Sequence, residues 1–246
     1  MDGNERAAAA GPDGVADPGS GRQQRVLPAP ASGKRARRVI RAVLFDVDGV
    51  LLDSKRANVA FYRALMRRFG YEGYSDAELE RGHSLTLLEA IASLTGEPEE
   101  RVRQIWEVAR RLEDYPFDLL ILPAGCEAAL TSLAQQYRLG IVTGRIRDGV
   151  EHFFDFSGLR DRFSVAVAYE DYSRPKPDAE PLLKACERLG VAARETVYVG
   201  DAPADYLCAR AAGTGFIAYG DAIEDAPRVA RSFAEIEPLL KALDDD

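Results

Sequence analysis

The feature that most constrains the fold is an alternation of short, β-branched apolar runs with longer segments of helical periodicity. The apolar runs have the length of strands and lie at residues 39–45, 139–142, 165–168, 196–199 and 215–218. Segments with helical spacing lie between them, at residues 124–137, 147–156, 179–189 and 204–212. The runs are apolar on both faces, which is typical of a parallel sheet covered by helices on each side. We therefore predict an α/β fold.

One insertion interrupts this alternation directly after the first run. Residues 54–123 contain no convincing strand, and their apolar residues recur at helical spacing. Three stripes result, namely Ala60, Phe61, Leu65 and Phe69, then Leu85, Leu88, Ile91 and Leu94, then Val102, Ile105, Trp106 and Ala109. The pattern predicts a small helical domain at residues 54–123, with the sheet domain formed by residues 39–53 and 124–246.

Residues 1–38 differ from the rest of the chain in composition. They are rich in Ala, Gly, Pro and Asp and contain few large apolar residues, so we expect a disordered tail. The tail ends in a basic cluster at residues 34–38. We interpret this cluster as a solvated charge run rather than as a nucleic-acid-binding or targeting element, because acidic residues in the tail argue against a transit peptide.

Composition limits the partners of this chain. Its 246 residues carry a net charge of −8, which argues against nucleic acid or an anionic membrane as the main partner. We find neither a membrane-spanning apolar stretch nor the pattern of a secretory signal. The three cysteines lack metal-type or redox-type spacing, so we expect buried thiols in a reducing compartment, the cytoplasm. A monomer and a homodimer are both compatible with the sequence.

Polar side chains follow four of the predicted strands. They are Asp46 and Asp48 after the first, Thr143, Gly144 and Arg145 after the second, Lys176 after the third, and Asp201 and Asp205 after the fourth. Open α/β sheets bind ligands at the carboxyl ends of their strands, where these eight residues would meet. We therefore expect one site at this edge of the sheet.

These residue types suit phosphate chemistry. Of two carboxylates at i and i+2, one can attack phosphorus while the other protonates the leaving oxygen and then activates water. A lysine supplies a point charge for phosphate, and a threonine hydroxyl can hydrogen-bond it. Asp201 and Asp205 add the hard oxygen ligands that Mg²⁺ prefers. Neighbouring carboxylates repel one another without a cation, so the cluster itself indicates a metal.

In their order and setting, the four segments resemble the four motifs of the haloacid-dehalogenase-like superfamily of phosphohydrolases, over about residues 39–218. The resemblance implies a Rossmann-like core with a helical cap inserted after the first motif, as in phosphoglycolate-phosphatase-like enzymes and β-phosphoglucomutase. By motif, Asp46 would be the nucleophile and Asp48 the general acid and base. The remaining implied roles are phosphate binding by Thr143, Gly144 and Lys176, and Mg²⁺ binding by Asp46, Asp201 and the backbone carbonyl of Asp48, supported by Asp205.

Two positions help to sort the members of the superfamily. Asp48 disfavours dehalogenation, since dehalogenases lack a carboxylic acid at this position. Val50 stands where many phosphatases of the family carry Thr and resembles the mutase branch. The segment from Thr143 to Arg145 looks more like a hydrolase, with Arg145 as a candidate substrate contact.

We therefore predict a Mg²⁺-dependent phosphatase that hydrolyses a small phosphomonoester metabolite, phosphoglycolate-like or a sugar phosphate, through an aspartyl-phosphate on Asp46. A β-phosphoglucomutase-like phosphomutase is one alternative. A catalytically silent binding protein of the same fold is another, although the intact motif residues argue against it.

Three weaker candidates lie outside the motifs. Residues 81–84 form a Gly-containing break between helices, where related caps place a specificity loop. Lys55 is interpreted as the solvated start of a helix. Glu170 and Asp171 could hold Lys176 in place through charge pairing.

Overall fold

The computed structural model describes residues 39–224 and 226–245, and the predictions for residues 1–38 lie outside this range. Within it, six parallel strands form one sheet in the order β3-β2-β1-β4-β5-β6. The strands are β1 (Ala42–Phe45), β2 (Arg138–Val142), β3 (Val165–Val167), β4 (Thr196–Gly200), β5 (Gly215–Tyr219) and β6 (Val229–Ala230). The parallel sheet predicted from the apolar runs is confirmed, and only the two-residue β6 was not foreseen.

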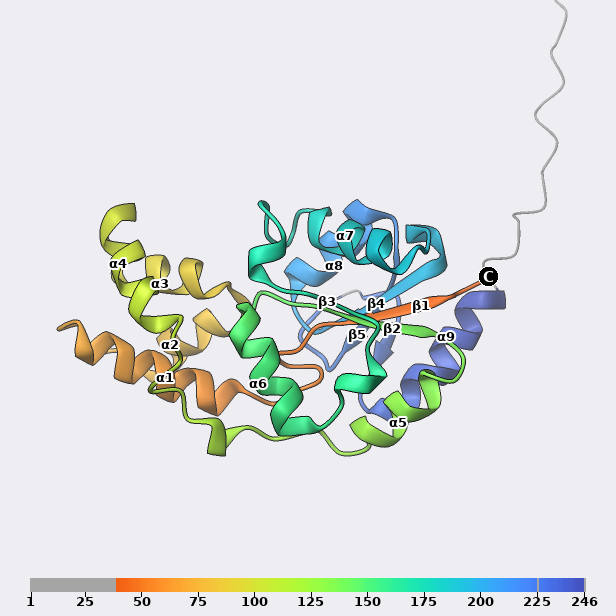
Figure 1. The fold of residues 1–246 in the computed structure, drawn as a ribbon, viewed down its shortest axis with the longest axis horizontal. Coiled ribbons are helices and arrows are strands. Elements are labelled where there is room, and N and C mark those ends of the chain that lie inside the picture. The colour runs from red at the N-terminus through yellow and green to blue at the C-terminus, as the bar shows by residue number, and fades with distance from the viewer. Residues whose placement is uncertain (1–38, 225, 246) are drawn as a thin grey trace, which may run out of the picture. The chain divides into compact units, whose positions relative to one another are not determined.

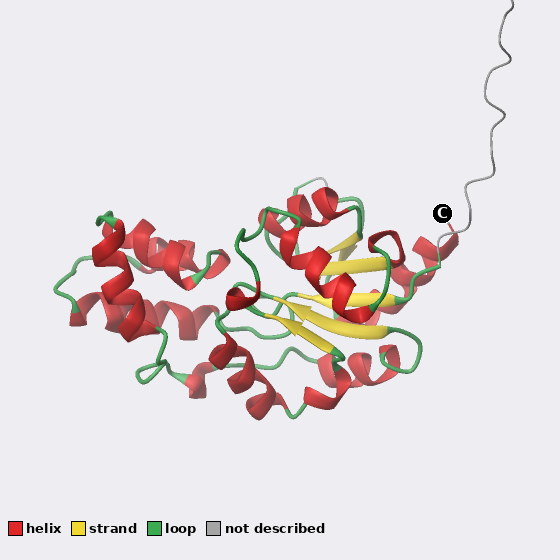
Figure 2. Cartoon of the chain, turned by 45° about the horizontal axis from the view of Figure 1, so that its top comes forward, coloured by secondary structure: helices red, strands yellow, loops and turns green. Residues whose placement is uncertain are grey.

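Helices cover both faces of the sheet (Figures 1 and 2). Along β1, Val43 and Phe45 belong to one buried cluster and Ala42 and Leu44 to the other, because successive side chains of a strand point to opposite faces. The first cluster contains residues of α5 (Cys126–Leu133), α6 (Arg147–Ser157) and α9 (Ile236–Asp245), the second those of α7 (Glu180–Leu189) and α8 (Pro203–Ala212). Of these helices, only α9 was missed in the sequence.

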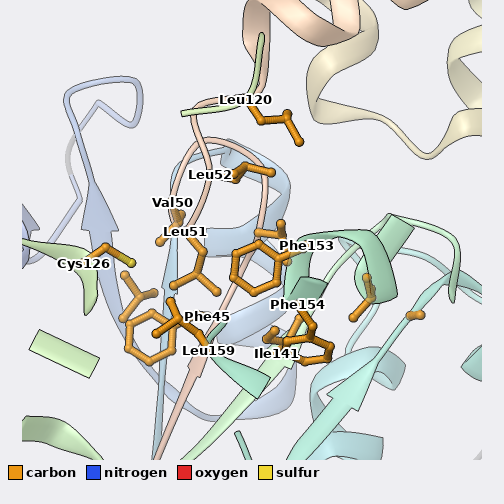
Figure 3. Packing of buried hydrophobic residues seen from close by; sticks show 14 of the residues in the cluster. Phe45, Val50, Leu51, Leu52, Leu120, Cys126, Ile141, Phe153, Phe154 and Leu159 are labelled. Atoms are coloured by element: carbon orange, nitrogen blue, oxygen red, sulfur yellow. The ribbon is translucent and has the colours of Figure 1, made fainter. Parts of the chain in front are cut away.

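The chain that leaves β1 is anchored in the first apolar cluster (Figure 3). Val47, Val50, Leu51 and Leu52 are fully buried, and Figure 3 shows Leu51 beside Phe45 and Phe153. Burial of one such side chain contributes about 1.5–3 kcal/mol. The turn that carries Asp46 and Asp48 is therefore held rigidly against the sheet.

The insertion is helical, as expected. It contains α1 (Lys55–Arg68), α2 (Asp76–Glu80), the 3₁₀ turn η1 (Arg81–Ser84), α3 (Leu87–Thr95) and α4 (Glu99–Ala109), which lie together beside the sheet in Figure 1. Their buried residues, among them Phe61, Ile91 and Ile105, continue the first apolar cluster. The boundaries of a separate cap domain at 54 and 123 stay a prediction.

Leu85, which the sequence placed in the second apolar stripe, lies outside the helix in the structure. Thr86 is the N-cap of α3, and its hydroxyl accepts a hydrogen bond from the backbone N–H of Glu89, whose carboxylate accepts one from the backbone N–H of Thr86. This capping box starts the helix at Leu87, so Leu85 lies before it and is 38% exposed. Leu85 is therefore not part of the apolar face of α3.

Candidate active site

The strand ends bring the predicted residues to one edge of the sheet. The backbone N–H of Asp46 donates to Val199 O at 3.0 Å, and that of Thr143 donates to Val167 O at 3.0 Å. Asp46 and Thr143 thus extend the hydrogen bonding of β1 and β2 by one residue beyond the strand ends. Eight predicted site residues line one cavity of about 90 Å³, namely Asp46, Asp48, Thr143, Gly144, Arg145, Lys176, Asp201 and Asp205.

Lys176 joins two carboxylates inside this cavity. Its Nζ lies 2.9 Å from Asp46 Oδ2 and 2.6 Å from Asp205 Oδ1, and it donates to Tyr198 Oη at 3.1 Å. Burial alone would lower the pKa of Lys176, but Asp205 and Asp46 outweigh it and raise that pKa well above its usual value. Lys176 is therefore a fixed positive charge beside Asp46.

The expected pairing of Lys176 with Glu170 and Asp171 is wrong. The Asp171 carboxylate forms ion pairs with Arg147 and Arg188 instead, the latter at 2.7 Å. Glu170 accepts a hydrogen bond from the backbone N–H of Arg147 at 2.8 Å. Both acidic side chains thus serve the start of α6 and the neighbouring surface rather than the cavity.

Three carboxylates meet at the ends of β1 and β4. Asp46, Asp201 and Asp205 each place one oxygen within 4.8 Å of the others. Burial and the neighbouring charges raise the pKa of Asp201 to about 8; burial, only partly offset by Lys176, raises that of Asp46 to about 6. One lysine does not neutralise three acids, so the cluster fits a hard divalent cation.

Asp205 is bound on both oxygens within this cluster. Its Oδ1 accepts from Lys176 and lies 3.0 Å from Tyr198 Oη, and its Oδ2 accepts from the backbone N–H of Ala202 at 3.0 Å. The side chain is fully buried. Asp205 thereby orients Lys176 and the start of α8 together.

Asp48 faces away from this acidic cluster and toward the helical insertion. Arg145 donates to both of its oxygens, from Nε at 2.7 Å and from Nη2 at 2.6 Å. Ser54 Oγ and Asn58 Nδ2 also donate to Asp48 Oδ1. Burial would raise the pKa of Asp48, but the Arg145 guanidinium outweighs it and holds that pKa at about 2.

Thr143 and Gly144 lie between the sheet edge and the insertion. The Thr143 hydroxyl accepts a hydrogen bond from the backbone N–H of Arg145 at 3.2 Å, which leaves its own hydrogen to donate into the cavity. A β-carbon on Gly144 would lie 3.5 Å from Thr86 Cγ2. The segment before α3 therefore packs directly over the second motif.

The insertion supplies the rest of the cavity wall. His83 and Ser84 line it, as the break at residues 81–84 suggested. Asn58 Nδ2 lies 2.9 Å from His83 Nδ1, and Tyr115 Oη donates to Asn58 Oδ1 at 2.7 Å. Lys55, in contrast, pairs with Glu80 at 2.8 Å, in agreement with its interpretation as a solvated helix start.

Several residues that position the site were not found in the sequence. Ser54, Asn58 and Tyr115 sit among ordinary helical or loop residues and carry no local signal. Tyr198 does carry one, since a buried tyrosine in an apolar strand needs a hydrogen-bond partner for its hydroxyl. The motif-derived roles of the eight predicted residues remain proposals, whereas their convergence on one cavity is observed.

Comparison with known proteins now identifies the family. The sequence model of the haloacid dehalogenase-like hydrolases matches residues 43–219. This chain belongs to that family. A phosphoglycolate phosphatase from Xanthomonas campestris pv. campestris (strain 8004) is 34% identical over 183 residues, which cover 72% of this chain and 82% of the relative.

A second sequence relative and a solved structure support the same family assignment. The pyrophosphatase PpaX of Halalkalibacterium halodurans is 32% identical over 188 residues, covering 75% of this chain and 85% of the relative. A crystal structure identified as a haloacid dehalogenase-like hydrolase from Bacteroides fragilis superposes with a TM-score of 0.72 at 30% identity, covering 80% of this chain and 99% of that one. The protein is thus a hydrolase of this family with a Rossmann-like core.

Two further observations concern the helices and the cysteines. In the part that the structure describes, no helix has both the length and the apolar character needed to cross a membrane. Cys126, Cys186 and Cys208 are free and buried, which confirms that the thiols are buried.

Proposed function

We propose that this protein is a Mg²⁺-dependent phosphatase that hydrolyses a small phosphomonoester through an aspartyl-phosphate on Asp46. The observation that carries the proposal is the position of Lys176, whose ammonium lies 2.9 Å from Asp46 Oδ2 in a cavity that Thr143 and Asp201 also line. A nucleophilic carboxylate, a buried cation and a hydroxyl donor together suit the transfer of a phosphoryl group.

The reaction proceeds in two steps. An oxygen of Asp46 attacks phosphorus, the bond from phosphorus to the alcohol oxygen breaks, and that oxygen takes a proton from Asp48. Asp48 then removes a proton from water, the resulting hydroxide attacks phosphorus, and the Asp46 carboxylate leaves. Lys176 and the Thr143 hydroxyl hold the phosphoryl oxygens in both steps.

The residues that would hold Mg²⁺ are Asp46, Asp201 and the backbone carbonyl of Asp48, with Asp205 behind them. Support comes from the three clustered carboxylates and from the raised pKa of Asp201, which burial and the neighbouring acids leave at about 8. When bound, the cation supplies the positive charge that balances these acids and the transferred phosphoryl group.

The size of the cavity limits the substrate. Pockets for drug-sized ligands measure roughly 300–1,000 Å³, whereas this cavity measures about 90 Å³. We therefore propose a small phosphorylated metabolite as partner, of the kind named in the related phosphoglycolate phosphatase.

The mutase alternative loses its main support. Val50 was its motivation, but this side chain is fully buried in the apolar cluster and does not line the cavity. Its identity therefore reflects packing against the sheet rather than the chemistry of the site.

The test is a phosphate-release assay with purified protein, Mg²⁺ and a panel of small phosphomonoesters. We expect free phosphate from at least one member, none with the Asp46→Asn variant, and an aspartyl-phosphate mimic trapped by beryllium fluoride in the wild type alone. A phosphosugar isomerised without free phosphate would instead establish a mutase. No release and no trapping would contradict the enzyme assignment, and full turnover by Asp46→Asn would remove Asp46 from its role.

A further inference from the structure

The arrangement around Asp48 does not suit the proton transfer that the proposed function asks of it. The four hydrogen-bonding groups around its carboxylate are Arg145 Nε, Arg145 Nη2, Ser54 Oγ and Asn58 Nδ2, and all four donate to it. A carboxyl group that only accepts has no partner to which it presents a proton. Asp48 must therefore exchange partners before it can protonate a leaving oxygen.

Arg145 is the partner that matters most in this exchange. Two parallel hydrogen bonds from one guanidinium are the strongest arrangement available to a carboxylate. The Arg145 and Asp48 side chains are only 10% and 16% exposed. A guanidinium this deeply buried needs an anion, so Asp48 leaves it at low cost only when another anion takes its place.

The position of Arg145 indicates where that second anion would sit. In the proposed reaction Asp46 attacks from one side of phosphorus, and Asp48 serves the leaving oxygen on the other. Lys176 contacts the Asp46 side. Arg145 contacts Asp48 and donates to Tyr115 Oη at 3.2 Å, beside the insertion. Arg145 is thus the cation on the side of the leaving group.

Within the part of the chain that the structure describes, no other arginine or lysine lines the cavity on this side. Among the described residues that line the cavity, Arg145 and Lys176 are the only members of these two types. The wall contributed by the insertion carries apolar and aromatic side chains such as Phe61, Tyr62 and Leu112. It also carries the polar side chains of Asn58, His83, Ser84 and Thr86 and one acid, Glu89, whose carboxylate accepts hydrogen bonds from Thr86. A negative group on the leaving alcohol would find Arg145 as its charge partner.

We propose that Arg145 selects substrates whose leaving group carries negative charge of its own, either an alcohol bearing a carboxylate or a phosphate, and that this charge displaces Asp48 from the Arg145 guanidinium and frees it for the leaving oxygen. The inference rests on the proposed phosphatase function. It makes Arg145 a specificity residue and couples recognition of the correct substrate to release of the general acid.

The test compares substrates that differ in this one group. The pair is 2-phosphoglycolate, whose leaving alcohol bears a carboxylate, and 2-hydroxyethyl phosphate, whose leaving alcohol bears a neutral hydroxyl. In inorganic pyrophosphate the leaving group is phosphate itself. For the wild type we expect kcat/KM to favour at least one anionic substrate over the neutral one by about tenfold or more. Whichever of 2-phosphoglycolate and pyrophosphate has the higher kcat/KM shows whether Arg145 recognises a carboxylate or a phosphate.

Substitution of Arg145 should remove this preference. In Arg145→Met we expect kcat/KM for the anionic substrate to fall to about that for the neutral one, whereas Arg145→Lys should keep part of the preference through its charge. Arg147→Met is the matched control, because Arg147 lies at the same helix start but pairs with Asp171 outside the cavity. It should leave the ratio of the two kcat/KM values unchanged.

A binding measurement keeps the inference testable if turnover is lost. In an Asp46→Asn background, calorimetry should show tighter binding of 2-phosphoglycolate or pyrophosphate than of 2-hydroxyethyl phosphate, and Arg145→Met should abolish the difference. Equal kcat/KM for anionic and neutral substrates in the wild type, or an equal loss for both in Arg145→Met, would overturn the inference and leave Arg145 a positioning residue for Asp48. Such a result would leave the phosphatase proposal intact, whereas absence of phosphate release from every substrate would overturn the phosphatase proposal itself.

Discussion

Gly49 and Asp201 lie so close together that a β-carbon on Gly49 would stand 2.0 Å from Asp201 Oδ2. Gly49 also has a φ of +77°, in the left-handed region that side chains disfavour. The turn after β1 and the residue that follows β4 are therefore in direct contact where the acidic cluster forms. Any side chain at position 49 must displace Asp201.

We expect Gly49→Ala to abolish turnover, because the new methyl group moves Asp201 out of the acidic cluster. Gly158→Ala is the matched control, since Gly158 has a φ of +68° but a β-carbon added there would meet no atom within 4 Å. The control should lose only about 1 kcal/mol of unfolding free energy and keep its turnover. Phosphate release and thermal unfolding of both variants provide the check. Similar activity in the two variants would contradict the contact.

Tyr198→Phe should weaken the hold on Lys176. The Tyr198 hydroxyl accepts from Lys176 at 3.1 Å and lies 3.0 Å from both Asp205 Oδ1 and Val142 O, to either of which it can donate its one hydrogen. Loss of a buried hydroxyl with these partners costs about 1–3 kcal/mol of unfolding free energy. We also expect a lower kcat, because Lys176 gains freedom beside Asp46.

Tyr206→Phe is the control for Tyr198→Phe, because Tyr206 contacts the same Phe216 ring from the next helix. Denaturant unfolding and steady-state kinetics measure the two effects. An unchanged stability and kcat in Tyr198→Phe would show that this hydroxyl does not support Lys176.

The stability of the metal-free protein should fall as the pH rises from about 4 to about 8. Burial and neighbouring acids raise the pKa of Asp201 to about 8, and burial, only partly offset by Lys176, raises that of Asp46 to about 6, both from 3.8. The folded protein then binds more protons than the unfolded chain in this window, so raising the pH favours unfolding. The lowered pKa values of Asp48 and Glu180, both about 2, act below this window.

Urea unfolding in the presence of EDTA at several pH values measures this slope. Asp201→Asn removes the group with the highest of these pKa values and should flatten the slope between pH 6 and 8. An equally steep slope in that variant would assign the pH dependence to other groups.

Mg²⁺ should stabilise the EDTA-treated protein more at pH 8 than at pH 6. Metal and protons compete for the same carboxylates, and at pH 6 Asp201, with a pKa of about 8, retains its proton. Thermal unfolding with and without Mg²⁺ measures the difference. Asp201→Asn should lose most of the response, and a response that is the same at both pH values would argue against a metal on Asp201.

The parallel sheet and the position of the site at its edge could be predicted from the sequence for a physical reason. Residues that are apolar on both faces of a short run can satisfy their burial only inside a covered parallel sheet. Parallel strands end at one edge, so Asp46, Thr143 and Asp201 had to meet there wherever the helices packed. The two-residue β6 is too short to show a period, whereas α9 is amphipathic, with Ile236, Leu240 and Leu243 buried, and could have been predicted.

The partners of the site residues were decided by the tertiary structure alone. Asp48 and Arg145 lie 97 residues apart in the chain, and Asn58 and Tyr115 lie 57 apart. Whether such side chains meet depends on how the insertion packs over the sheet edge, and no local pattern encodes it. The mistaken pairing of Asp171 with Lys176 has the same origin, because several cations lay within reach along the chain.

The sequence by itself therefore determined the sheet, the place of the site and the chemical types of its residues. Only the packing of side chains in three dimensions determined that Lys176 is shared by Asp46 and Asp205, and that Arg145 occupies the Asp48 carboxylate. Strand and helix periodicity are local properties, whereas a hydrogen-bond partner is selected by shape, burial and charge among segments that are distant in the chain.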